Sequence, residues 1–208
     1  MSIVLYHHPY SRAATALWML EEVGVPYDLR DVDIMKGAQK SAEILALNPM
    51  GKLPTLTDDD LVVTEVAAIG LYLADRYAYG RLAPKVDSAE RGTYLRWSLF
   101  APSVIEPGAM AKMLGWTYKD GQAGWGSNEA MLNSMQSALS HGDYILGDTF
   151  SMADAIFGGT LRYMLQFNMI EARDVFTNYA ARLGERLAMK RADARHAELL
   201  VSLGLSQS

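Results

Sequence analysis

The first 77 residues alternate between short apolar segments with strand spacing and longer segments with helical spacing. Residues 2–6 (SIVLY) are apolar and rich in β-forming side chains, which is typical of a buried strand. Over residues 12–23 apolar side chains recur at helical spacing, and Gly24 follows where a helix is expected to end. Residues 27–33 alternate apolar and polar positions. The pattern therefore predicts a strand, a helix and a second strand.

A second helix and a hairpin are predicted in the remainder of this segment. Residues 39–47 have the spacing of a short helix, and an Asn-Pro pair follows that would end it. Residues 53–57 and 61–63 flank three consecutive aspartates, which indicates a hairpin, and helical spacing resumes over 65–77. A βαβ unit followed by a hairpin and a helix is the thioredoxin-like arrangement.

Strand patterns end at this point, and the rest of the sequence is helical. The predicted helices cover residues 90–113, 129–141, 152–166, 175–190 and 192–203. Pro102 and Pro107 are expected to kink or interrupt the first of them, and Ser151 with Asp154 resembles a capping box. The sequence thus predicts an α/β thioredoxin-like domain over 1–78 and an all-α domain over 89–208, joined by a linker over 79–88.

Composition excludes several classes of function. The 208 residues contain no cysteine, so disulfides, thiolate metal sites and a catalytic cysteine are ruled out. The net charge is −5 without a cluster of Lys and Arg, and no apolar run reaches the length of a membrane span, so neither nucleic acid nor membrane is an expected partner. The opening residues lack the pattern of a secretion signal, and a cytoplasmic location is expected.

Motifs for other chemistry are missing as well. There is no G-x-S-x-G segment and no Walker loop, and the glycines near residue 124 follow no strand. His7 and His8 are adjacent in an extended segment, so they point to opposite faces and cannot bind one metal ion together. No metal site is expected.

Four segments in order resemble the cytosolic glutathione transferases, in particular bacterial members with a serine active site. They are LYHHPYSRAATALWMLEEVGVPYDL at 5–29, NPMGKLPTL at 48–56, TEVAAIGLYLADRY at 64–77 and the Ser151–Asp154 box. The resemblance covers nearly the whole chain. It implies the glutathione transferase fold, a homodimer, and reduced glutathione as cosubstrate.

The resemblance also assigns residues to glutathione binding. Pro54 would be cis and would leave the backbone N–H and C=O of Leu53 free to pair with glutathione. Glu65 would accept the α-ammonium of the γ-glutamyl group, although a carboxylate is favoured at a helix start in any case. The N–H of Val66 would meet the adjacent carboxylate. The family usually has serine where this chain has Val66, so a hydroxyl donor is lost and glutathione is expected to bind roughly ten-fold more weakly.

Ser11 matches the hydroxyl that hydrogen-bonds the glutathione sulfur, and such a donor at a helix N-terminus lowers a thiol pKa. A serine in this position is also a good helix cap. Tyr6 is the competing sulfur partner, or else a core aromatic residue. Lys52 is a candidate for the glycyl carboxylate, with Lys36 and Lys40 as weaker candidates; the alternative for each is a solvated lysine.

The expected activity is addition of the glutathione thiolate to small hydrophobic electrophiles. Apolar side chains of the second domain are candidates for the electrophile pocket, although such a stripe is more often core; they are Trp97, Phe100, Met110, Met113 and Trp116. Two alternatives remain open. One is a non-catalytic interaction or scaffold module of the same fold, and the other is a glutathione-dependent isomerase, dehalogenase or peroxidase.

Overall fold

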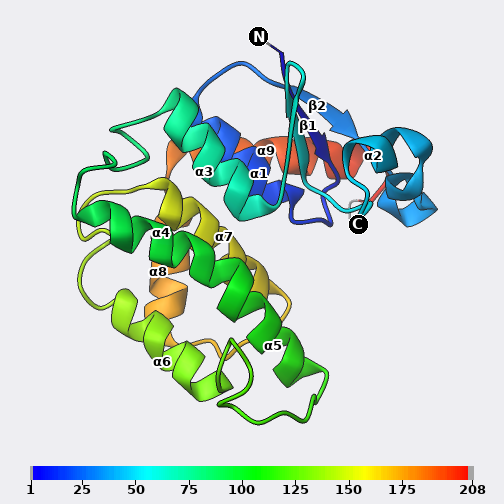
Figure 1. The fold of residues 1–208 in the computed structure, drawn as a ribbon. Helices are drawn as coiled ribbons and strands as arrows, with labels where there is room; N and C mark the ends of the chain where they lie inside the picture. The colour runs from blue at the N-terminus through cyan, green and yellow to red at the C-terminus, as the bar shows by residue number, and fades with distance from the viewer. Residues whose placement is uncertain (1, 206–208) are drawn as a thin grey trace. The chain divides into compact units, whose positions relative to one another are not determined.

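A computed structural model describes residues 2–205 and groups the chain into two compact units (Figure 1). The first unit contains residues 1–73 and 186–208, and the second contains residues 74–185. The fold class predicted from the sequence is confirmed: a thioredoxin-like β-α segment with a mixed four-stranded sheet is followed by helices. Among the described residues no helix is long and apolar enough to cross a membrane.

The first unit is built on a sheet with strand order β2-β1-β3-β4. β1 pairs parallel with β2 and antiparallel with β3, and β4 pairs antiparallel with β3. The elements of this unit are β1 (Ile3–His7), α1 (Ala13–Val23), β2 (Asp28–Asp31), η1 (Ile34–Lys36), η2 (Ala38–Lys40), α2 (Ala42–Leu47), β3 (Thr55–Asp58), β4 (Leu61–Thr64), most of α3 (Val66–Tyr77) and α9 (Leu187–Ser202).

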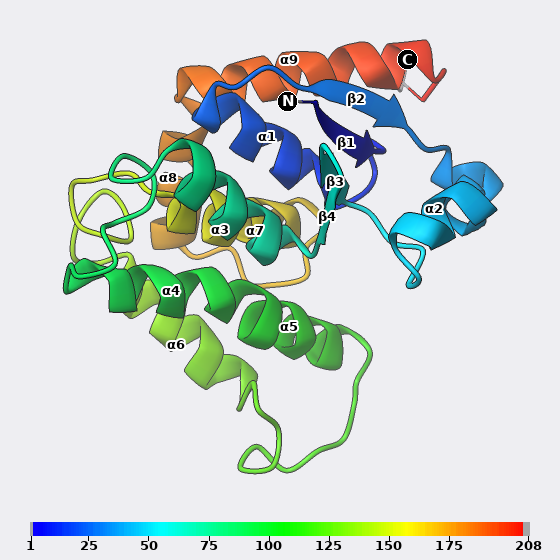
Figure 2. The same cartoon turned by 45° about the horizontal axis from the view of Figure 1, so that its top comes forward.

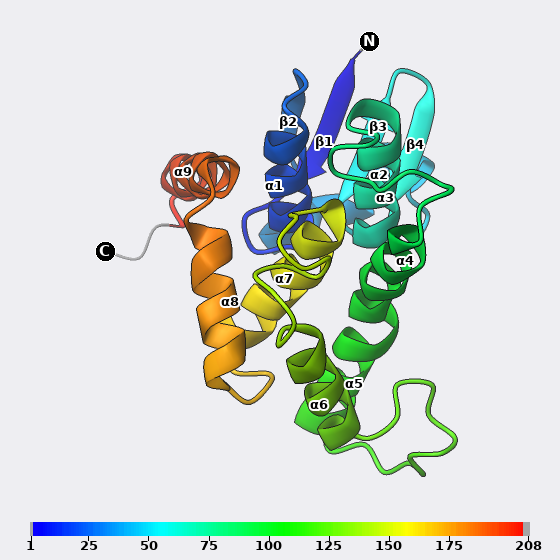
Figure 3. The same ribbon diagram turned by 90° about the vertical axis from the view of Figure 1, so that its left-hand side faces the viewer.

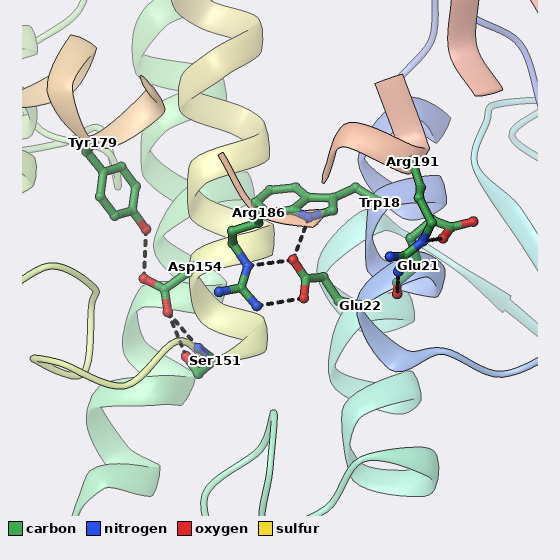
Figure 4. A network of polar contacts seen from close by, with 8 residues as sticks. All are labelled: Trp18, Glu21, Glu22, Ser151, Asp154, Tyr179, Arg186 and Arg191. Atoms are coloured by element: carbon green, nitrogen blue, oxygen red, sulfur yellow. Dashed lines mark hydrogen bonds and ion pairs between the residues drawn. The ribbon is translucent and has the colours of Figure 1, made fainter. Parts of the chain in front are cut away.

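α1 is the central helix of the first unit. It contacts β1, and α9 runs along it (Figure 2). Because two elements cover it, nearly all its side chains are buried, including the polar Glu22. Glu22 accepts hydrogen bonds from Trp18 Nε1 at 2.8 Å and from Arg186 Nε and Nη2 at 2.6 and 2.8 Å (Figure 4). This buried ion pair fastens the start of α9 to α1, and the Arg191–Glu21 pair at 2.6 Å continues the contact.

The second unit is helical, with α7 at its centre. Figure 3 shows α7 between α4 and α8, and α7 packs against both. Gly158 of α7 permits the close approach of α8, since a Cβ there would clash with Leu183 Cδ1. The elements are α4 (Glu90–Phe100), η3 (Ala101–Ile105), α5 (Glu106–Met113), α6 (Asn128–Ala138), α7 (Met152–Gln166) and α8 (Asp174–Gly184).

The predicted capping box of α7 is confirmed. Asp154 Oδ2 accepts from Ser151 N at 2.9 Å and from Ser151 Oγ at 3.0 Å, while Oδ1 accepts from Ile145 N at 2.7 Å and Tyr179 Oη at 2.8 Å (Figure 4). Burial raises the pKa of Asp154, and these four hydrogen bonds act in the opposite direction. We call Asp154 and its four donors the capping network.

Several predicted boundaries differ from the structure. The helix expected over 39–47 is divided into the 3₁₀ turn η2 and the helix α2, because Ser41 between them is extended and accepts from Ile44 N as the N-cap. The helix over 90–113 is interrupted near Pro102, as expected, by the π-helical segment η3, and Pro107 lies in the first turn of α5. The break between the last two helices lies at residues 185–186 rather than 191, since Arg186 is extended and bonds Glu22.

Contacts also group the end of the chain differently from the predicted domains. α9 belongs to the first compact unit, although the sequence placed residues 89–208 together in the helical domain. The residues around the predicted linker, from Ala74 onwards, group with the second unit. The division at 78 and 89 remains a prediction about domains, while the compact units follow the packing of α9 on α1.

Candidate active site

Three predicted site segments leave or enter the sheet at the same end. Thr55 at the start of β3 pairs with Tyr6 near the end of β1 and with Thr64 at the end of β4. Leu53 and Pro54 precede Thr55, Glu65 follows Thr64, and the turn that carries Ser11 follows β1. The strand register therefore brings the backbone segments that carry Ser11, Leu53 and Glu65 to one edge of the sheet.

Ser11 lies at the entrance of α1 in a turn closed by His8. The His8 carbonyl accepts from Ser11 N at 3.0 Å and from Ser11 Oγ at 2.8 Å. Ser11 Oγ in turn accepts from Ala13 N at 3.1 Å, so the serine caps the helix. The geometry therefore agrees with Ser11 as a helix cap. The hydroxyl also lies at the positive end of the α1 dipole, where an anion is stabilised.

Tyr6 packs in the interior of the first unit. Its ring is 8% exposed and lies in a cluster with Val32 and Ile44, against which Leu53 also packs. This environment agrees with the interpretation of Tyr6 as a core aromatic residue. Of the two candidate sulfur partners, Ser11 is therefore the one that lies at a helix N-terminus.

The turn before β3 leaves one peptide unit open. The Leu53–Pro54 bond is cis, as expected from the sequence. Asn48 Nδ2 and Thr55 Oγ1 both donate to the Lys52 carbonyl, at 3.0 and 3.2 Å, and hold the turn from inside. Within residues 2–205 neither the N–H nor the C=O of Leu53 has a hydrogen-bond partner. An extended peptide that pairs with Leu53 would satisfy both groups.

The start of α3 is strained and open. Glu65 has φ of +66°, a left-handed conformation that costs an L-residue about 1–2 kcal/mol, and its side chain is exposed. Its carbonyl accepts from Ile69 N at 2.9 Å, so Glu65 is the residue that caps the helix backbone. The first N–H groups of the helix, beginning with Val66, have no intrahelical acceptor. Val66 itself offers no side-chain donor.

The three candidate lysines differ in their contacts. Lys40 Nζ donates to the Met50 carbonyl at 2.8 Å, and Lys36 forms an ion pair with Asp33 at 2.9 Å. Lys52 is exposed and has no ion pair within the described part of the chain. Lys52 is therefore the candidate whose charge is available to a ligand.

The candidate pocket residues of the second unit do not form one wall. Trp97 is buried and packs edge to face against Phe157 with a centroid distance of 5.7 Å, whereas Met113 and Trp116 are each 53% exposed. Of the five, only Trp97 lines the cavity of about 500 Å³ between α4 and α6. Its other lining residues include Arg96, Asn133 and His141, which make it a partly polar hollow.

The sequence pattern of His7 and His8, close to Ser11, bears only on metal binding. In the part of the chain that the structure describes, no group of three or more His, Cys, Asp or Glu is placed to hold a metal ion. His7 is fully buried, and neither of its ring nitrogens has a hydrogen-bond partner among residues 2–205. Burial first, and then His196 and His8, lower its pKa to about 3. His8 is also buried, and burial lowers its pKa as well. Only the turn geometry reveals how closely His8 is tied to Ser11.

These features define a thioredoxin-like protein whose open peptide unit, helix N-terminus and capping serine share one sheet edge. A family model described as "Glutathione S-transferase, N-terminal domain" matches residues 1–75. Glutathione S-transferase F10 of Arabidopsis thaliana is 26% identical over 212 residues, which cover 94% of this chain and 98% of that protein.

Two solved structures extend the similarity to three dimensions. A glutathione transferase from Methylococcus capsulatus has a TM-score of 0.77 at 26% identity, covering 94% of this chain and 98% of that one. A glutathione transferase from Burkholderia graminis, with two glutathione molecules bound per subunit, has a TM-score of 0.76 at 25% identity, covering 92% and 87%. The chain belongs to the cytosolic glutathione transferase family.

Proposed function

We propose that this glutathione transferase binds reduced glutathione along Leu53 and adds its thiolate to small hydrophobic electrophiles. The observation that carries the proposal is the Leu53 peptide unit, whose N–H and C=O lack partners within residues 2–205. The γ-glutamyl end would meet the Glu65 carboxylate and the Val66 N–H, and the glycyl carboxylate would meet Lys52. Two solved relatives contain bound glutathione, which supports glutathione as the ligand.

Ser11 would stabilise the thiolate. Its hydroxyl proton points to the His8 carbonyl, and rotation about the Cβ–Oγ bond redirects it to a sulfur anion while Ala13 N–H continues to hold Oγ. A charged acceptor is stronger than a neutral carbonyl, so the exchange is favourable once the thiol has lost its proton to solvent. The thiolate then forms a C–S bond, and the leaving group departs with its bonding electrons.

Replacement of the serine tests this role. Ser11→Ala is expected to lower turnover at pH 6.5 by about ten-fold or more, with a much smaller change in glutathione affinity. Ser127→Ala is the matched control, because Ser127 Oγ also caps a helix, accepting from Ala130 N at 3.1 Å, but in the second unit. Equal loss of turnover and affinity in Ser11→Ala, or no loss, would remove Ser11 from the catalytic role.

One residue favours the scaffold alternative. Val66 stands where the family usually has serine and offers no hydroxyl to glutathione, so binding by the natural chain has to be measured directly. Calorimetric titration with reduced glutathione is expected to give micromolar to millimolar binding. Absence of binding that Val66→Ser restores would make the scaffold function the leading one. A screen of isomerase, dehalogenase and peroxide substrates follows only if binding is found.

We also propose a homodimer and a cytoplasmic location. The edge strand β4 exposes Leu61 and Val62, at 47% and 37%, which is an apolar surface suited to a second copy of the chain. Light scattering on the purified protein is expected to give twice the chain mass of 22.9 kDa. A monomer at micromolar concentration would contradict the dimer and leave the glutathione site unaffected.

A further inference from the structure

The turn that carries Ser11 is organised around a single histidine. Between His8 and Arg12 only Tyr10 and Ser11 have backbone N–H groups, since Pro9 has none. Tyr10 N donates to His8 Nδ1 at 3.1 Å, and Ser11 N donates to the His8 carbonyl at 3.0 Å. Ser11 Oγ donates to the same carbonyl at 2.8 Å. The side chain and the carbonyl of His8 therefore take up both N–H groups and the serine hydroxyl.

We propose that His8 is a positioning residue for Ser11, and that its neutral imidazole holds the turn in the form that aims the hydroxyl. This inference rests on the proposed role of Ser11. The imidazole Nδ1 of His8 accepts from the backbone N–H of Tyr10, two residues later. This hydrogen bond fixes the peptide planes between the two residues and therefore the direction of the His8 carbonyl. His8 acts through the turn and does not touch glutathione.

The geometry also determines which protonation state of the His8 ring can hold the turn. Because Nδ1 accepts a hydrogen bond it carries no proton, and the neutral ring must carry its proton on Nε2. That nitrogen is buried and has no partner within the described residues. A second proton on the ring would place an N–H against the Tyr10 N–H, and the contact that holds the turn would become a repulsion.

Charged and titratable groups of four neighbouring segments act on His8. Asp31 at the end of β2 and Asp33 at η1 favour its protonation, whereas burial opposes it and dominates. His7 on β1 and His196 on α9 belong to the same histidine cluster, with ring centroids 6.5 Å apart. Tyr10 packs edge to face on the His8 ring at 5.7 Å and donates its hydroxyl to the Leu205 carbonyl. The turn is thus expected to be intact at neutral pH and to loosen in acid below pH 6.5.

Two substitutions separate the acceptor from the bulk of the ring. His8→Asn retains an acceptor on Cγ, where Oδ1 takes the place of Nδ1, and cannot gain a proton. His8→Leu retains apolar volume without an acceptor. His196→Leu is the control, because His196 belongs to the same histidine cluster but forms no hydrogen bond with Tyr10 or Ser11 in the described structure.

The measured quantity is the pKa of the thiol of bound glutathione, taken from the ultraviolet absorbance of its thiolate. His8→Leu is expected to raise this pKa by about 1, as Ser11→Ala does, and to lower kcat/KM at pH 6.5 about ten-fold. His8→Asn and His196→Leu are expected to leave it near the natural value. In the Ser11→Ala background His8→Leu should have no further effect, which a merely structural role would not produce.

The outcomes distinguish this inference from the proposed function. If Ser11→Ala raises the thiol pKa and His8→Leu does not, His8 is not a positioning residue and the serine mechanism stands. If Ser11→Ala has no effect, both fall together. If His8→Leu fails to fold, the pH profile decides: the natural enzyme should lose kcat/KM below pH 6.5 more steeply than His8→Asn, and identical profiles would overturn the proposal.

Discussion

The capping network of the second unit and the candidate site of the first unit differ in how completely their polar groups are hydrogen-bonded. Asp154 is almost fully enclosed, yet both of its oxygens accept two hydrogen bonds each. At the sheet edge of the first unit the Leu53 peptide lacks partners within the described chain, and Glu65 is held at φ of +66°. Both ring nitrogens of His7 are buried, and neither has a hydrogen-bond partner in the part of the chain that the structure describes.

The difference separates stability from function. A satisfied buried network contributes to the fold and leaves nothing for a ligand to bind. Open backbone groups and a strained helix start cost free energy in the unbound protein, and a ligand that satisfies them recovers part of it. The contrast predicts that changes in the capping network unfold the protein, while changes at the sheet edge alter glutathione binding.

The largest effect is expected at Asp154. Asp154→Ala leaves four donors without their acceptor, among them the buried Tyr179 hydroxyl and Ile145 N–H, and should lower the free energy of unfolding by about 3–5 kcal/mol. Urea unfolding measures this. Asp143→Ala is the control, since its pair with Arg182 is exposed and should contribute less than about 1 kcal/mol. A similar small loss in both variants would show that the buried hydrogen bonds of Asp154 contribute no more to stability than an exposed ion pair.

The second effect concerns His7 and pH. Its folded pKa of about 3 lies below the ordinary 6.5, so the unfolded chain binds a proton that the folded one does not. Stability therefore falls as pH drops below 6.5 and levels off below about 3, with a loss of about 2 kcal/mol by pH 5. His7→Phe should remove this contribution and change stability little at pH 7.5, because no hydrogen bond is lost.

Unfolding curves at pH 5 and pH 7.5 measure the difference, with the exposed His141→Phe as control. Parallel pH dependence in the natural protein and His7→Phe would show that His7 does not titrate on unfolding.

The third effect is on glutathione affinity at Val66. Val66→Ser restores a hydroxyl at the start of α3 and should tighten glutathione binding about ten-fold, whereas Val66→Ala should not. Calorimetric titration of the three proteins gives the comparison. An equal gain in the alanine variant would mean that the valine acts by its bulk and that the missing hydroxyl is unimportant.

The smallest effect is expected at Lys52. Because its side chain is exposed, Lys52→Ala should weaken glutathione binding by only a few-fold, and less at high salt. Lys36→Ala, which removes a lysine already paired with Asp33, should change nothing. Equal losses in the two variants would indicate a general effect of charge rather than a contact.

Much of the fold could be predicted because it depends on local pattern. The strands, the α7 helix over 152–166 and its capping box follow from periodicity and short motifs, whereas the cis proline was expected from the family resemblance. The start of α9 could not, since Arg186 is fixed by Glu22, 164 positions away in the sequence. That contact also explains why α9 joins the first compact unit.

Only part of the candidate site could be predicted from the sequence. Motif likeness pointed to Ser11, Leu53 and Glu65, and the strand register brings their segments to one edge. The strain at Glu65 and the hydrogen bonds of His8 depend on backbone angles that no residue pattern specifies. The electrophile pocket depends on side chains from several helices, and the five apolar candidates have different environments.

The most direct test is a titration of ¹⁵N-labelled protein with reduced glutathione, followed by the backbone amide resonances. Large shifts are expected at the amides of Leu53, Val66 and Ser11, and none at Ile145 and Ser151, whose N–H groups already donate to Asp154. Calorimetric binding without a shift at Leu53, or with its largest shifts in the capping network, would contradict the claim that the open edge of the first unit is the glutathione site.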